Sequence, residues 1–278
     1  MTSIDQLISN SPILITGGSS GIGLALAREF AVRGGSLHLV ARREEVLSKA
    51  IDSLSEDLGN TGKRPVAHIC DVTKSSDVDH LFQELEKTGV RTGILVNAAG
   101  MSVPGTVVDA PMADFEMMMD TNFLGTVRVV RSVVPGMISA GQGYILNVGS
   151  LGSLVSCYGM SGYCAAKFAV RGFTESLRAE LKWHGIGVSL LCPPDTDTPM
   201  LQAERPLRVP ETEALNRAAP MISAEQVAKE AFRGMQKGKA HIIPSGTARI
   251  TALGQRLAPG IIEALSDRIV KKARSQSR

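Results

Sequence analysis

Short, strongly apolar runs alternate with longer amphipathic stretches along almost the whole sequence. Such alternation predicts parallel strands joined by crossover helices. The first expected helix covers about 22–33 and ends at Gly34 and Gly35, where a left-handed cap would fit. We therefore predict an α/β fold, a doubly wound Rossmann-type parallel sheet of about seven strands with helices on both faces. The expected strands are 13–15, 37–40, 66–70, 94–96, 144–148, 188–191 and 241–243.

Length and composition predict a single domain over 1–278. A chain of 278 residues, 44% of them hydrophobic, can bury a full core without metal or disulfide links. Its four cysteines form no Cys-x-x-Cys pair and its five histidines are scattered, so we predict neither a metal site nor a disulfide framework. The net charge of +3 is too small to indicate a nucleic-acid partner.

The two ends of the chain bear on location. The N-terminal segment contains Asp5 and has no basic run followed by an apolar stretch, so it does not resemble a secretory signal. We expect no stretch of the roughly 18 apolar residues that a membrane span needs. Arg249, Arg256 and Glu263 interrupt the most apolar part of the tail. These observations predict a cytoplasmic protein that is soluble or peripheral at a membrane surface.

Two segments of the last third depart from the alternation. Residues 193–222 are rich in proline with little apolar periodicity, and connections of this length are usually binding loops, so we expect a substrate lid. The tail from about 247 fits a peripheral helix on an anionic membrane, or equally a helix packed on its own domain or on a partner subunit. Its apolar residues at helical spacing are Ile261, Ile262, Leu265, Ile269 and Val270, followed by the basic residues Lys271, Lys272, Arg274 and Arg278.

A glycine-rich turn lies between the first expected strand and the first expected helix. Glycines let the backbone approach a pyrophosphate, and a helix N-terminus offers free N–H groups with a partial positive charge. We interpret the turn as a dinucleotide site, with a plain tight connection as the alternative, because its spacing differs from Gly-x-Gly-x-x-Gly. The residues expected to contact the dinucleotide here are Gly17, Ser19, Ser20, Gly21, Ile22 and Gly23.

The end of the second expected strand bears on the choice of dinucleotide. Enzymes that use NAD carry an acid there that binds the ribose hydroxyls, whereas this chain has Ala41 followed by Arg42 and Arg43. Two arginines can pair with a 2′-phosphate through charge-assisted hydrogen bonds, which predicts NADP(H), with a solvated helix start as the alternative. We expect Asp71 either to accept a hydrogen bond from the adenine amine or to cap the next turn.

Tyr163 and Lys167 are four residues apart in a stretch of helical period, so both lie on one face of the expected helix. A tyrosine has an ordinary pKa of about 10, and a neighbouring ammonium would favour its phenolate and make it a better acid–base catalyst. A pair at this spacing also occurs on ordinary helix surfaces, so its meaning depends on the rest of the chain.

Taken together, the motifs resemble the short-chain dehydrogenase/reductase family over nearly the whole chain. The glycine turn matches the family's Thr-Gly-x-x-x-Gly-x-Gly, and Asn97 to Gly100 is close to its Asn-Asn-Ala-Gly. Tyr163 to Lys167 matches its Tyr-x-x-x-Lys, and Ser150 stands thirteen residues before the tyrosine, at the place of the family's catalytic serine.

The resemblance implies hydride transfer between a nicotinamide and a carbonyl or alcohol carbon. Tyr163 would give a proton to the carbonyl oxygen during reduction, and Ser150 would polarise that oxygen. Lys167 would lower the tyrosine pKa and hold the nicotinamide ribose, while Asn122, which corresponds to the catalytic asparagine, would anchor a water linking Lys167 to solvent. The family also implies a homodimer or homotetramer. Further implied cofactor contacts are Val72, Asn97, Ala98, Gly100, Pro193, Thr196 and Thr198.

Within the family, the segments 193–199 and 210–212 resemble the 3-ketosphinganine reductases, which reduce a long-chain amino ketone with NADPH in sphingolipid synthesis. The resemblance therefore predicts a long-chain, lipid-like ketone. A 3-oxoacyl thioester and a hydroxysteroid-type ketone are the alternatives among enzymes, and a non-catalytic dinucleotide sensor is the alternative of a different class. Four acids either offer negative charge to a substrate ammonium or are solvated lid residues: Asp195, Asp197, Glu204 and Glu211.

Overall fold

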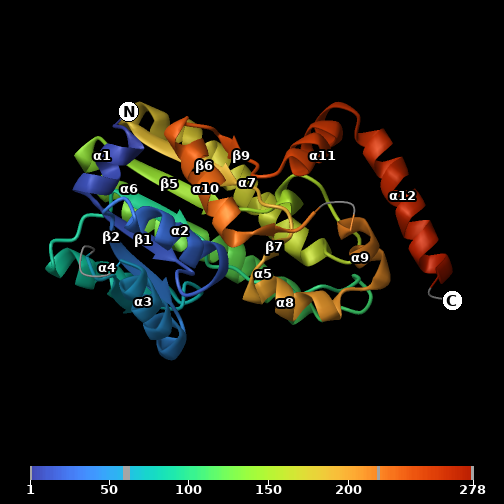
Figure 1. Ribbon diagram of the computed structural model, residues 1–278, viewed down its shortest axis with the longest axis horizontal. Helices are drawn as coiled ribbons and strands as arrows, with labels where there is room; N and C mark the ends of the chain where they lie inside the picture. Colours follow the sequence, from blue (N-terminus) through green and yellow to red (C-terminus); the bar gives the residue numbers. More distant parts are fainter. Residues whose placement is uncertain (1, 59–62, 218–219, 277–278) are drawn as a thin grey trace.

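The computed structural model describes residues 2–58, 63–217 and 220–276. In these ranges seven parallel strands form one sheet in the order β3-β2-β1-β4-β5-β6-β9 (Figure 1). The predicted doubly wound sheet is confirmed. Its strands are β1 (Pro12–Thr16), β2 (Ser36–Ala41), β3 (Val66–Ile69), β4 (Ile94–Asn97), β5 (Gly143–Val148), β6 (Ile186–Leu191) and β9 (His241–Ile242).

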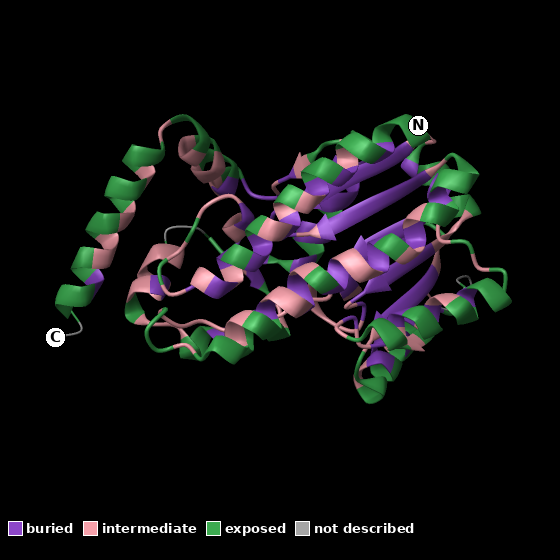
Figure 2. Cartoon of the chain, turned by 180° about the vertical axis from the view of Figure 1, so that it is seen from behind, coloured by how far each residue is buried: buried purple, intermediate pink, exposed green. Residues whose placement is uncertain are grey.

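Both faces of the sheet are covered by helices. Neighbouring residues of a strand point to opposite faces, so Ile13 and Ile15 pack in one core while Leu14 packs in the other. Buried strands therefore lie between more exposed helices (Figure 2), and the strand ends are left for a ligand. The first core is closed by α1 (Ile4–Asn10), α2 (Gly21–Ala31), α3 (Glu44–Leu58) and α10 (Ala224–Gln236), the second by α4 (Ser75–Lys87), α6 (Gly125–Ala140) and α7 (Ser161–Leu181).

One long helix passes the test of length and composition for a membrane span. It covers 112–140 with a mean hydropathy of 1.2 and consists of α5 (Met112–Met119), a π-helical turn η2 (Asp120–Leu124) and α6. The helix contains charged residues such as Asp120 and Arg128, so the expectation that no uninterrupted apolar stretch of about 18 residues occurs is not contradicted. Val129, Val130 and Val133 of α6 pack in the second core, and the charged Arg128 pairs with Asp120 at 2.8 Å. The helix is a core element of the sheet fold.

The proline-rich segment contains two short helices instead of an irregular loop. Pro199 and Pro210 stand at the start of these helices, where the missing N–H costs no intrahelical hydrogen bond. Helices this short show no apolar period, which explains why the sequence suggested a loop. The elements are β7 (Thr196–Asp197), α8 (Pro199–Glu204), a 3₁₀ turn η5 (Arg205–Leu207), α9 (Pro210–Asn216) and β8 (Ile222–Ser223), which pairs with β7.

The tail forms two helices, α11 (Gly246–Leu257) and α12 (Pro259–Gln276), which we call the C-terminal arm. The arm lies at one end of the molecule, with α12 beside α9 (Figure 1). Ala273 is buried there, and the guanidinium of Arg274 lies 3.6 Å from the carboxylate of Glu211. Most other residues of the arm are exposed (Figure 2). Arg278 of the predicted basic group lies outside the described residues.

Two histidines meet between the neighbouring strands β2 and β3. The rings of His38 and His68 stack with their centroids 5.2 Å apart, and Nδ1 of His38 lies 2.9 Å from Nε2 of His68. One ring must be neutral to accept this hydrogen bond. Burial, helped by the neighbouring His68, lowers the pKa of His38 to about 4.

This pair should make the free energy of unfolding depend on pH. The pKa of His38 is about 4 in the folded protein against 6.5 as its ordinary value, so the unfolded chain binds more protons between these values. Stability should therefore fall as the pH drops from 6.5 towards 4, and His38→Gln should flatten that part of the profile. Urea midpoints across this range test it, with His80→Gln, an exposed histidine, as the control. Parallel profiles for the wild type and His38→Gln would contradict the expectation.

Candidate active site

The glycine turn brings the start of α2 against the loop that follows β4. A Cβ on Gly17, whose φ is +66°, would stand 2.7 Å from the Ala98 carbonyl group, and a Cβ on Gly23 would stand 2.3 Å from the Gly17 oxygen. Only glycine fits these positions. The N-cap residue Ser20 makes no side-chain capping bond, so the first N–H groups of α2 remain available to an anion.

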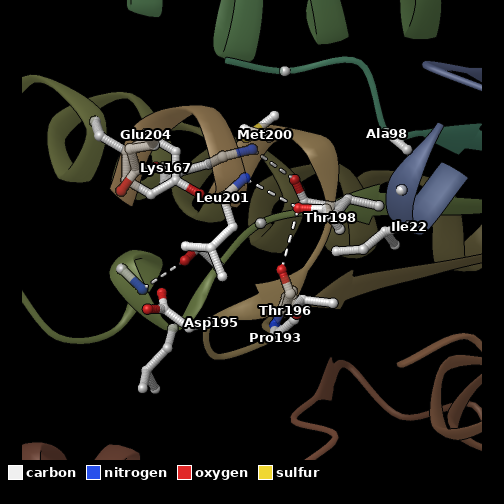
Figure 3. Close-up of a pocket in the computed structure, with 18 of the residues that line it drawn as sticks. Ile22, Ala98, Lys167, Pro193, Asp195, Thr196, Thr198, Met200, Leu201 and Glu204 are labelled. Atoms are coloured by element: carbon white, nitrogen blue, oxygen red, sulfur yellow. Dashed lines mark hydrogen bonds between the residues drawn. The ribbon is translucent and has the colours of Figure 1, made fainter. Parts of the chain in front are cut away.

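A cavity of about 520 Å³ opens at the carboxyl ends of the strands, where the sheet order reverses between β1 and β4. Figure 3 shows Ile22 and Ala98 on one side of this cavity and Asp195 and Glu204 on the other. The cavity wall includes these predicted residues: Gly17, Ser19, Ser20, Gly21, Ile22, Gly23, Arg42, Arg43, Asp71, Val72, Ala98, Gly100, Ser150, Tyr163, Lys167, Pro193, Thr196 and Thr198.

Two predicted residues, Asn97 and Asn122, are buried and do not belong to the described cavity wall. The Asn97 amide donates to Asn147 Oδ1 at 2.9 Å, and the Asn147 amide donates to Thr174 Oγ1 at 2.9 Å. This chain of hydrogen bonds joins β4, β5 and α7 under the cavity. In this structure the side chain of Asn97 therefore supports the strands.

Arg42 and Asp71 form the far end of the cavity, after β2 and β3. The guanidinium of Arg42 is well exposed and lies 3.9 Å from the carboxylate of Asp71. Although burial opposes ionisation, hydrogen bonds from the N–H and hydroxyl of Thr73, together with Arg42, hold the pKa of Asp71 below its ordinary value. A fixed carboxylate and an exposed guanidinium side by side suit an adenosine with an anionic ribose substituent.

Tyr163 enters the cavity from the first turn of α7, opposite Ser150 at the end of β5. The Ser150 hydroxyl accepts a hydrogen bond from Gly152 N–H at 3.0 Å, which fixes the serine on its short turn. Burial raises the pKa of Tyr163 well above its ordinary value; a hydrogen bond with Ser150 acts the other way, while the charges of Glu204 and Asp195 raise the pKa further. The phenol therefore holds its proton at neutral pH.

Lys167 lies one turn further along α7, beneath the tyrosine. Its Nζ is 5.8 Å from the centroid of the Tyr163 ring and donates to the Val148 carbonyl oxygen at 3.0 Å. The side chain is buried, and this burial lowers the pKa of Lys167 to about 8. The group is still mostly an ammonium at pH 7, so it can stabilise negative charge that develops on the phenol.

Asn122 lies in the π-helical turn between α5 and α6. Its Oδ1 accepts from Met101 N–H at 3.1 Å, and its Nδ2 donates to the carbonyls of Met101 and Met118, both at 2.9 Å. A Cβ on Gly100 would stand 2.7 Å from Asn122 Oδ1 and 3.5 Å from Lys167 Nζ. The asparagine thus fixes the loop after β4 directly beside the lysine. π-Helical turns of this kind are frequent at functional sites.

Part of the site was not predicted from the sequence. Arg208 is buried beside the cavity, donates to both carboxylate oxygens of Asp195 at 2.6 and 3.0 Å, and donates to Glu204 at 2.7 Å. The spacing of Glu204 and Arg208, four apart on a helical segment, was the only local signal for this contact. Apolar residues from distant elements complete this part of the wall: Val155, Met160, Leu201, Leu215, Ile262, Leu265 and Ile269.

A family model described as short chain dehydrogenase matches residues 11–208, well over half of the chain. The chain belongs to the short-chain dehydrogenases. It is 32% identical over 263 residues to the 3-ketodihydrosphingosine reductase of Dictyostelium discoideum, an alignment covering 90% of this chain and 78% of that relative. This short-chain dehydrogenase is therefore an oxidoreductase whose relatives include reductases named for a sphingoid ketone.

Two solved structures share the fold of this short-chain dehydrogenase. One is a short-chain dehydrogenase from Sphingobium yanoikuyae in complex with NADPH, with a TM-score of 0.76 and 29% identity, covering 91% of this chain and 95% of that one. The other is from Burkholderia phymatum in complex with NAD, with a TM-score of 0.79 and 27% identity, covering 93% and 96%. The fold thus binds a nicotinamide dinucleotide, and the glycine cradle and open helix N-terminus of this chain fit its pyrophosphate.

The geometry predicts a large effect of Tyr163→Phe. The change removes the phenolic proton but keeps the ring that packs over Lys167, so turnover of a ketone should fall at least about a hundredfold while the fold and dinucleotide binding persist. Steady-state rates and dinucleotide fluorescence titrations measure the two effects, with Tyr158→Phe on the more exposed neighbouring tyrosine as the control. A Tyr163→Phe enzyme with more than about a tenth of wild-type turnover would show that another group gives the proton.

Proposed function

We propose that this short-chain dehydrogenase reduces the ketone of a long-chain amino ketone with NADPH, with 3-ketosphinganine as substrate and sphinganine as product. One observation carries the proposal. The cavity joins the Tyr163–Lys167 pair to a largely apolar wall that includes the ionic group Asp195–Glu204–Arg208. The relationship to reductases named for 3-ketodihydrosphingosine supports it.

The ionic group favours a cationic substrate. It contains two carboxylates and one guanidinium, and the side chains of Glu204 and Arg208 are 6% and 3% exposed. A third carboxylate, Glu213, lies outside the cavity wall, 3.9 Å from Arg208, and pairs there with Arg205 at 2.7 Å and with Arg217 at 3.6 Å. The part of this network that lines the cavity therefore contains one more carboxylate than guanidinium. An ammonium next to the substrate ketone would pair with these carboxylates.

The rest of the wall suits an alkyl chain. Leu201 and Leu215 come from the lid helices, and Ile262, Leu265 and Ile269 come from α12. Covering a long hydrocarbon chain with these side chains removes apolar surface from water at both partners. A 3-oxoacyl thioester of coenzyme A or of a carrier protein has no ammonium beside its ketone, so it would leave the carboxylates near Tyr163 without a cationic partner.

Three side chains of the cavity have separate roles in the reduction: Tyr163, Ser150 and Lys167. The glycine cradle would hold the pyrophosphate of a reduced nicotinamide dinucleotide, which would supply a hydride for the carbonyl carbon. Tyr163, protonated because its pKa is raised, donates its proton to the carbonyl oxygen as the carbon–oxygen double bond becomes a single bond. The hydroxyl of Ser150 donates a hydrogen bond to that oxygen and polarises the carbonyl group. Lys167, an ammonium held by the Val148 carbonyl, stabilises the phenolate left on Tyr163 until a proton from solvent replaces the one given up.

The choice of NADPH rests on Arg42 and Arg43 in the cavity wall and on Ala41 where an acid would bind ribose hydroxyls.

A hydrogen bond to a charged group is worth roughly 1.5 to 3 kcal/mol, so Arg42→Ala should weaken the binding of NADPH about ten- to a hundredfold and leave the binding of NADH almost unchanged. Ala41→Asp should turn the preference towards NADH, because the new acid accepts from the ribose and repels the phosphate. Kinetics with both cofactors measure this. Equal losses for NADH and NADPH in Arg42→Ala would mean that the arginine supports the fold instead.

Substrate charge can be tested with Glu204→Gln, which keeps an oxygen for the Arg208 hydrogen bond and removes one negative charge. We expect kcat/KM for 3-ketosphinganine to fall at least about tenfold, while the analogue without the amino group reacts as well as before or better. Asp197→Asn, an exposed acid of the same segment outside the cavity wall, is the matched control. Equal losses for the two ketones would overturn the assigned role of the ionic group.

The substrate itself is decided by measuring NADPH oxidation with 3-ketosphinganine, a 3-oxoacyl thioester and a ketosteroid side by side. The amino ketone should be the best substrate. A better thioester or steroid would place the enzyme with the other reductases of the family. No turnover of any ketone would favour a dinucleotide sensor. The grouping of Ser150, Tyr163 and Lys167 in one cavity argues against a sensor.

We also propose a cytoplasmic protein that forms a homodimer or homotetramer. Met117, Leu124 and Phe168 are about 40% or more exposed on the α5–α7 side of the molecule, which supports an apolar contact between subunits. The mass in solution, measured by light scattering, tests the assembly.

A further inference from the structure

The C-terminal arm carries a run of exposed aliphatic side chains. Ile250, Leu253 and Leu257 are 55 to 74% exposed on one face of α11, and Ile261 and Leu265 are 63% and 49% exposed on α12. Leu257 and Ile261 lie on either side of the junction between the helices, so the two faces follow one another without a break in the sequence. Solvent-exposed faces of this kind mark an interaction surface.

The charge of the arm indicates what covers this surface. Residues 246–276 contain six basic and two acidic residues, a net charge of +4, whereas the whole chain carries +3. The rest of the protein is therefore slightly negative, and the arm holds all of the net positive charge. Four of the basic side chains have no ion-pair partner among the described residues: Arg256, Arg268, Lys271 and Lys272. Exposed aliphatic residues beside unpaired cations complement the acyl chains and headgroups of an anionic bilayer.

The arm also connects this surface to the active site. Leu265 is half exposed and at the same time lines the cavity, next to Ile262 and Ile269 of the same helix. Leu265 therefore belongs both to the exposed face of α12 and to the cavity wall. In a symmetric contact between the arms of two copies, the unpaired cations of both arms would face one another, which disfavours that occupant.

We propose that the C-terminal arm is a docking surface for anionic membranes, which places the mouth of the cavity at the lipid. Docking rests on the surface of the arm alone. Delivery of the substrate from the bilayer rests, in addition, on the function proposed above.

Sedimentation of the purified full-length protein with lipid vesicles tests the docking surface. The protein should sediment with vesicles of phosphatidylglycerol and phosphatidylcholine and much less with phosphatidylcholine alone. The double variant Leu257→Ser/Ile261→Ser and the double variant Lys271→Gln/Lys272→Gln should each lower the bound fraction at least about fivefold. Val107→Ser/Val108→Ser, which removes two exposed valines elsewhere, is the matched control. Neither Leu257 nor Ile261 belongs to the cavity wall, so reduction of a short soluble ketone should persist.

Equal recovery in the supernatant with and without anionic lipid would overturn the proposal, as would binding that neither double variant weakens. A change in mass by light scattering in Leu257→Ser/Ile261→Ser, without any vesicle binding by the wild type, would assign the surface to a second copy of the chain instead. Vesicle binding needs no substrate. A protein that binds vesicles but does not reduce 3-ketosphinganine would therefore contradict the proposed substrate and leave the docking surface in place.

Discussion

Burial of the parallel sheet on both faces is the constraint on which the rest of the structure depends. Ile13, Leu14 and Ile15 are consecutive, yet they fill two different cores, so helices must cover both sides. The ends of the strands are then the place where a large cavity can open. The glycine cradle, Ala98, Ser150 and the start of the lid all follow the carboxyl ends of strands, which is why they meet.

Within the cavity, burial sets the protonation states that reduction needs. It raises the pKa of Tyr163 and lowers that of Lys167, because both charged forms lose contact with water. The tyrosine therefore keeps its proton at neutral pH, while the lysine remains mostly an ammonium. The hydrogen bonds of Asn122 and Val148 fix the loop and the lysine around that chemistry.

The two halves of the cavity come from different parts of the chain. The first two thirds supply the dinucleotide side and the candidate catalytic residues, and the family model ends at Arg208. The lid helix α9 and the C-terminal arm lie beyond that limit and supply Leu215, Ile262 and Ile269. A common fold thus carries the chemistry, while the last third of this chain shapes what enters.

Local patterns in the sequence determined the strands, the glycine turn and the positions of Ser150, Tyr163 and Lys167, because each depends on a few neighbouring residues. Tertiary structure decided the rest. The side chain of Asn97 joins strands instead of reaching the cavity, since Asn147 and Thr174 arrive from other elements. The partners of Arg208 and the cavity face of α12 depend on segments that fold back from a distance. The long helix 112–140 is apolar enough for a membrane, and only its packing on the sheet makes it a core helix.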